Sequence, residues 1–113
     1  MKTHVQVAVI GGGVVGCSVL YHLTKLGWPD VCLIERSELT SGSTWHAAGG
    51  FHTLNSDPNM AALQGYTINL YKELEAISGL TCGLHHVGGI TLADSPERMD
   101  FIKAARAMHR HMG

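Results

Sequence analysis

The chain has 113 residues, of which 45% are hydrophobic and 15% charged, and its formal net charge is −1. Its composition excludes a disordered tail, and its length suits one small domain but is short for a dinucleotide-dependent enzyme. A net charge this small also excludes the broad positive field that attracts nucleic acid or an anionic membrane.

The N-terminal third follows the pattern of one βαβ unit. The β-branched run at residues 5–10 predicts a buried parallel strand, and the glycines at 11–13 predict a turn. Apolar residues at helical spacing predict a helix over 14–26, which Gly27 caps. The short apolar run at 31–34 predicts a second strand.

Residues 36–56 form a connection that is rich in Gly, Ser, Thr and His. A connection of this length inside a compact domain is usually functional. Asp57 and Pro58 then predict the start of a helix that ends at Gly79.

The last part of the chain predicts two further elements. Alternating residues at 89–93 predict a strand, and Ser95 and Pro96 begin a final helix that runs to the chain's end. One βαβ unit and one further strand make a very small sheet. We therefore expect the chain to be the N-terminal piece of a larger protein.

These elements predict an α/β fold in two parts. A Rossmann-like βαβ unit and its loop occupy residues 1–56, and an incomplete helix–strand–helix continuation, the start of a mixed substrate domain, occupies 57–113.

The cysteines number three and lack a CxxC pair, which indicates buried free thiols in a reducing compartment. The early first strand leaves no room for a targeting peptide, and no run is long enough to span a membrane. We expect a soluble cytoplasmic protein.

The glycine turn carries the pattern Gly11-x-Gly13-x-x-Gly16 between a strand and a helix. This context is the one in which the pattern binds a dinucleotide, with the pyrophosphate on the helix N-terminus. Glu35 follows the second strand, where a carboxylate accepts hydrogen bonds from ribose hydroxyls. It would repel a 2′-phosphate, so FAD or NAD is favoured over NADP. Arg36 either stacks on the adenine or lies in solvent.

A second segment, Leu39-Thr40-Ser41-Gly42-Ser43-Thr44-Trp45-His46-Ala47-Ala48-Gly49, resembles the dimethylglycine and sarcosine dehydrogenases, flavoenzymes of the D-amino-acid-oxidase-like group. Further matches lie at residues 70–75, at Gly79 and at 88–93, so the resemblance covers nearly the whole chain. Gly89 departs from the family pattern, because a small polar residue is expected at position 89.

The resemblance implies FAD as the cofactor, with His46 as its covalent attachment point; a neutral imidazole is a competent nucleophile for this. The alternatives are that His46 only contacts a noncovalent flavin, or does not contact it. Small residues around it would let the backbone pass close to the ring. The predicted cofactor-binding residues are Gly11, Gly13, Val14, Val15, Gly16, Glu35, Arg36, Gly42, Ser43, Thr44, Trp45, His46, Ala47, Ala48, Gly49 and Gly50.

The resemblance further implies oxidation of an N-methylated glycine, with hydride transfer to the flavin. Tetrahydrofolate would take the one-carbon unit, and an electron-transfer flavoprotein or oxygen would take the electrons. No catalytic residue is predicted within this chain, because the substrate-binding residues are expected beyond Gly113. The histidine pairs, 85–86 and 109–111, lack metal-ligand spacing, so no metal is predicted. The alternatives are an amine oxidase without folate coupling, a non-enzymatic regulatory relative and an inactive fragment.

Overall fold

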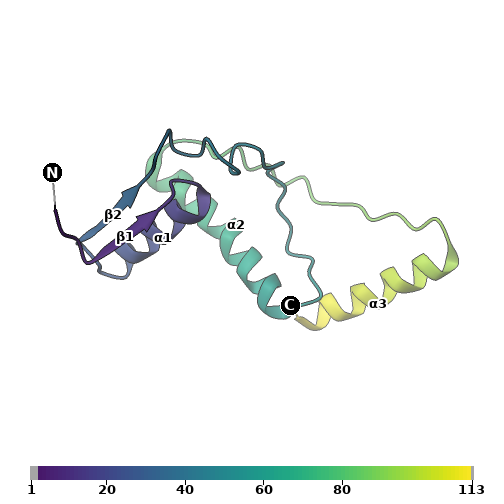
Figure 1. Ribbon diagram of the computed structural model, residues 1–113. Coiled ribbons are helices and arrows are strands. Elements are labelled where there is room, and N and C mark those ends of the chain that lie inside the picture. The colour runs from purple at the N-terminus through teal and green to yellow at the C-terminus, as the bar shows by residue number, and fades with distance from the viewer. Residues whose placement is uncertain (1–2, 113) are drawn as a thin grey trace. The chain divides into compact units, whose positions relative to one another are not determined.

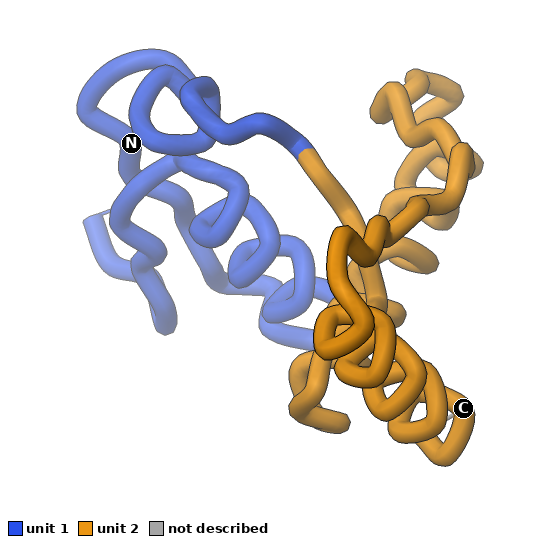
Figure 2. The backbone as a smooth tube through the Cα atoms, turned by 90° about the vertical axis from the view of Figure 1, so that its right-hand side faces the viewer, with its two compact units in different colours: residues 1–49 blue, residues 50–113 orange. Residues whose placement is uncertain are grey.

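The computed structural model describes residues 3–112, and the chain forms two compact units, residues 1–49 and residues 50–113 (Figure 2). The first unit holds both strands and one helix, and the second holds two helices. This mixture confirms the predicted α/β class. The predicted domain boundary after residue 56 stays a prediction.

The first unit is a βαβ unit with a two-stranded parallel sheet (Figure 1). Strand β1 (Val7–Ile10) pairs with β2 (Val31–Ile34) so that Val7 lies opposite Val31 and Ile10 opposite Ile34. The sheet begins at Val7 rather than at the predicted residue 5. Its first contact is the Asp30 carbonyl, which accepts hydrogen bonds from the Gln6 and Val7 amides at 3.0 and 3.4 Å.

Helix α1 (Val14–Lys25) connects the two strands and ends close to the predicted residue 26. The Leu26 amide donates to the His22 carbonyl at 2.9 Å, and Gly27 then takes a φ of 87°. A positive φ reverses the chain direction at little cost only for glycine. The helix therefore stops one residue earlier than predicted, and the chain turns back toward β2.

The second unit contains helices α2 (Pro58–Ser78) and α3 (Pro96–Met112). The Asp57 carboxylate accepts a hydrogen bond from the Met60 amide at 2.9 Å, and Gly79 ends α2 in the left-handed conformation. Ser95 caps α3 by accepting from the Arg98 amide at 3.1 Å. The predicted helix starts are thus confirmed. No helix in residues 3–112 is both long and apolar enough to cross a membrane.

Two predictions about the rest of the chain need correction. Within residues 3–112, β1 and β2 are the only strands, and residues 89–93 are extended without pairing, so the predicted strand there is wrong. An extended segment becomes a strand only beside a partner, and the unit that contains residues 89–93 offers none. The three cysteines are free as predicted, but Cys82 is exposed, while Cys17 and Cys32 are half-buried.

Candidate cofactor site

The glycine turn between β1 and α1 brings the helix into direct contact with the preceding loop. Gly11 has a φ of 104°, and a Cβ on Gly16 would lie 1.8 Å from the Gly11 carbonyl oxygen. Only glycine allows the helix to lie this close to the turn. The close approach required by a dinucleotide fingerprint is therefore present in the backbone itself.

Gly12, which was not among the predicted site residues, joins three segments of the first unit. Its amide donates to the Glu35 carboxylate at 2.6 Å, and its carbonyl accepts from the Thr40 amide at 2.9 Å. A Cβ on Gly12 would lie 2.5 Å from Leu39 Cδ2. The run of three glycines was a signal for this role, but the partners become evident only in the fold.

Glu35 follows β2 and is half-buried against the glycine turn. Besides the Gly12 amide, its carboxylate accepts a hydrogen bond from the Ser37 amide at 3.0 Å. The Gly12 bond first and the Ser37 bond second hold the pKa of Glu35 below its ordinary value of 4.5, and the Arg36 charge acts in the same direction. The carboxylate is ionised at neutral pH, so it favours a ribose hydroxyl and disfavours a phosphate at this position.

The start of α1 is capped by a residue from the second segment. Gly13 is the N-cap and offers no side chain, but Thr44 Oγ1 accepts a hydrogen bond from the Val14 amide at 2.9 Å. A Cβ on Gly13 would lie 3.0 Å from the same hydroxyl oxygen. The structure thus brings together the two predicted motifs, which are 30 residues apart at this contact.

Residues 38–47 form a series of tight turns rather than an irregular loop. Thr40 has a φ of 67°, a strained value for a β-branched residue, and its carbonyl accepts from the Trp45 amide at 3.1 Å. The His46 amide donates to the Ser43 carbonyl at 3.2 Å, and the Ala47 amide to the Thr44 carbonyl at 3.3 Å. The turns present a compact surface of small residues.

His46 is exposed, and its ring is held by the backbone of the same segment. Its Nδ1 lies 2.9 Å from the Gly42 carbonyl oxygen. A carbonyl oxygen only accepts, so Nδ1 carries the proton and Nε2 keeps its lone pair in the neutral ring. Trp45 beside it is 78% exposed.

The other predicted residues are distributed over both units. Val15 and Gly16 lie in the first turn of α1, and Arg36 is exposed after β2. The remaining residues of the second segment are exposed, and all but Gly50 belong to the first unit; they are Gly42, Ser43, Ala47, Ala48, Gly49 and Gly50.

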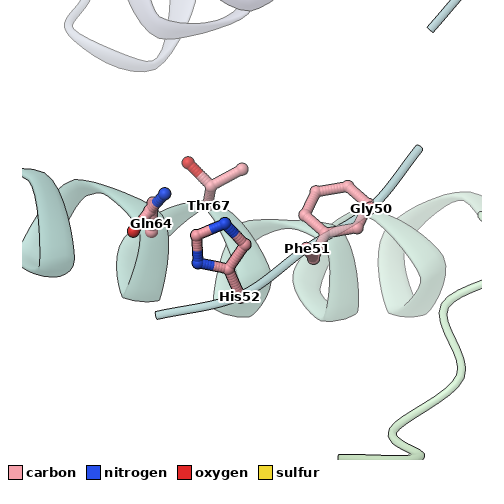
Figure 3. Close-up of a pocket in the computed structure, with 5 residues that line it drawn as sticks. All are labelled: Gly50, Phe51, His52, Gln64 and Thr67. Carbon is pink, nitrogen blue, oxygen red and sulfur yellow. The ribbon is translucent and has the colours of Figure 1, made fainter. Parts of the chain in front are cut away.

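A cavity of about 100 Å³ lies in the second unit, directly after the second segment (Figure 3). The Gln64 Oε1 atom is buried and lacks a hydrogen-bond partner among the described residues. Apart from Gly50, the residues that line the cavity were not predicted as site residues; only Gln64 and Thr67 lie on α2, where helical spacing is also that of core packing. The lining residues are Gly50, Phe51, His52, Gln64 and Thr67.

Within residues 3–112, no three His, Cys, Asp or Glu side chains are grouped as metal ligands would be.

Comparison with known proteins shows to which family the chain is similar. A family model described as "FAD dependent oxidoreductase" (DAO) matches residues 6–113. Mitochondrial dimethylglycine dehydrogenase of Rattus norvegicus is 46% identical over 102 residues, or 90% of this chain. Mitochondrial sarcosine dehydrogenase of Homo sapiens is 40% identical over 109 residues, or 96% of the chain. The predicted resemblance is thereby confirmed.

A third relative is named as a regulatory subunit rather than as a dehydrogenase. The mitochondrial regulatory subunit of pyruvate dehydrogenase phosphatase from Mus musculus is 36% identical over 103 residues, or 91% of the chain. The chain spans 12% of the length of each of these three relatives.

Proposed function

The chain belongs to the family of FAD-dependent oxidoreductases, and we propose that it forms the FAD-binding part of an enzyme that oxidises an N-methylated glycine, dimethylglycine or sarcosine. One observation carries this proposal. The backbone of α1 contacts the glycine turn so closely that the missing Gly16 Cβ would lie 1.8 Å from a carbonyl oxygen. That approach is the close helix packing of a dinucleotide-binding βαβ unit, so it supports FAD binding. The substrate is inferred from the similarity to dimethylglycine and sarcosine dehydrogenases.

Different residues of the first unit would bind different parts of the FAD molecule. The glycine turn and the next amides of α1, those of Val15 and Gly16, would hold the pyrophosphate, since the helix dipole favours an anion there. The Val14 amide lies beside them and donates to Thr44 Oγ1. Ionised Glu35 accepts hydrogen bonds from the ribose hydroxyls. The fit is that of a cofactor without a 2′-phosphate, because the carboxylate would repel one.

The small-residue segment 42–50 would hold the isoalloxazine ring, with His46 Nε2 as the atom that would attach the flavin at its 8α carbon. The Nδ1 contact with Gly42 supports this choice of nitrogen, because it leaves Nε2 as the nucleophile. When bound, the flavin supplies the acceptor for a hydride from the N-methyl carbon. The chain's own contribution is to bind and orient it.

The proposal extends to the whole protein in three respects. Tetrahydrofolate takes up the one-carbon unit, an electron-transfer flavoprotein accepts the electrons, and the protein works in the cytoplasm. The first two follow from the resemblance alone, and the third from the free cysteines alone. The first is tested by measuring formaldehyde release, which should fall when tetrahydrofolate is added. The second is tested by measuring the reduction of an added electron-transfer flavoprotein.

Two other functions compete with this one. An amine oxidase of the same group would release peroxide as it consumes oxygen, independently of folate. A regulatory protein without flavin is the other, and the match to a phosphatase regulatory subunit gives it a precedent. The close glycine turn and the oriented His46 favour the flavin-binding functions, because a flavin-free protein has no use for either.

Acid denaturation of the full-length protein tests the covalent proposal. We expect yellow flavin to remain with the precipitated wild-type chain and peptide mapping to place it on His46. His46→Ala should fold and hold FAD reversibly, so that acid releases all of it. His52→Ala, which removes an imidazole six residues along the chain, is the matched control and should keep its flavin. Release of all flavin from the wild type refutes covalent attachment, and retention on another residue refutes the site.

A further inference from the structure

The start of α1 takes its cap from a distant residue. A helix N-cap is ordinarily a polar side chain next to the helix, but Gly13 has none and Thr44 supplies the hydroxyl at 2.9 Å from the Val14 amide. The contact is specific, because a Cβ on Gly13 would lie 3.0 Å from Thr44 Oγ1. Together with the bond from the Thr40 amide to the Gly12 carbonyl, this contact ties the second segment to the start of α1, next to the Val15 and Gly16 amides that would receive the pyrophosphate.

Thr44 is also joined to His46 by the turns of the second segment. The Thr44 carbonyl accepts from the Ala47 amide at 3.3 Å, and the His46 ring is held by the Gly42 carbonyl at 2.9 Å. The imidazole thus lies two residues from Thr44 in a segment that is held by hydrogen bonds among its own residues 40–47. A displacement of the Thr44 hydroxyl would carry the imidazole with it.

We propose that Thr44 is a positioning residue for flavin attachment, which fixes the distance from the pyrophosphate site at the start of α1 to the Nε2 atom of His46. This inference rests on the proposed function. Because the pyrophosphate sets where the rest of the FAD molecule lies, the reacting nitrogen must be placed relative to the same amides. Misplacement of a reacting atom by about 1 Å costs on the order of a hundredfold in rate.

The attachment that Thr44 would assist balances as follows. His46 Nε2 forms a bond to the 8α carbon, that carbon loses one proton, and the imidazole loses the Nδ1 proton to solvent. The two electrons of the broken C–H bond pass to the flavin ring system with two protons. Dioxygen then takes both electrons and both protons and becomes hydrogen peroxide.

The test uses full-length protein made without flavin, to which a saturating concentration of FAD is added. The time course of acid-precipitable flavin gives the attachment rate, and quenching of flavin fluorescence gives the affinity before attachment. We expect Thr44→Val, which keeps the shape and removes the hydroxyl, to slow attachment at least tenfold while it still binds FAD. Thr44→Ser, which keeps the hydroxyl, should restore a rate within about threefold of wild type.

Other outcomes decide against the inference in distinguishable ways. If the wild type attaches flavin and Thr44→Val does so equally fast, the inference fails while the proposed function stands. If Thr44→Val binds FAD more tightly at an unchanged attachment rate, the hydroxyl is only a cap that the pyrophosphate displaces. If the wild type retains no flavin after acid, the inference and the proposed covalent attachment both fail, while reversible FAD binding would still stand. Thermal melting of each apoprotein checks folding. Should Thr44→Val not fold, a slow Thr44→Ser would still overturn the inference.

Discussion

Gly16→Ala is the substitution that tests the glycine turn most directly. The added methyl group would lie 1.8 Å from the Gly11 carbonyl oxygen, whereas real Cβ atoms essentially never come within 3.0 Å of another atom. The first turn of α1 must therefore move by about 1.2 Å. The obstacle is backbone, which cannot rotate away as a side chain can. Overpacking ordinarily costs about 1–3 kcal/mol, and we expect the upper end of that range here.

The same movement takes the α1 amides away from the pyrophosphate. We expect the free energy of unfolding to fall by about 3 kcal/mol and FAD affinity before attachment to fall by roughly a hundredfold or more, since 1.4 kcal/mol is a factor of ten. Urea unfolding and FAD titration of the full-length apoprotein measure the two effects. Gly89→Ala is the matched control, because a Cβ there meets nothing within 4 Å. The reasoning is refuted if the Gly16→Ala and Gly89→Ala proteins agree in both measurements.

Two further substitutions test the contacts at the ends of the elements. The folded-state pKa of Glu35 lies below 4.5, so its ionised form stabilises the fold above that pH and the contribution is lost as pH falls through the folded-state pKa. Glu35→Gln should therefore be less stable than wild type near pH 7, and a series of urea titrations should show the difference vanish in acid; a constant difference contradicts this. Asp57→Ala should lower stability by about 1 kcal/mol because the Met60 amide loses its cap, while Asp57→Asn should stay within a few tenths. Equal unfolding midpoints for both Asp57 variants would show that the cap contributes nothing.

The parts of the fold that depend on neighbouring residues could be predicted from the sequence. The start of α2 follows from Asp57 and Pro58, and its end follows from Gly79, because caps act within one turn of a helix. The predicted strand at 89–93 failed for the opposite reason. Alternation describes one strand only, and pairing depends on a partner elsewhere in the chain.

The candidate site shows the same division. The fingerprint glycines and Glu35 could be identified because their spacing along the chain is fixed by the βαβ unit. The roles of Gly12 and of the Thr44 hydroxyl could not, since each depends on a contact between segments more than 20 residues apart. The cavity beside α2 was missed because helical spacing alone does not distinguish a lining residue from a packed one.

Gly12 has a consequence for how this unit can vary among related proteins. Its amide donates to Glu35, and its carbonyl accepts from Thr40. The Leu39 side chain lies where a Cβ of residue 12 would be. Changes at these four positions should not be independent, because residues that share a partner show non-additive effects. A Cβ at position 12 would lie 2.5 Å from Leu39 Cδ2 and 3.1 Å from Glu35 Cβ, so a larger residue there should occur together with changes at 39 or 35 in sequence alignments. Natural variation at this junction is therefore expected to occur in linked pairs rather than as single replacements.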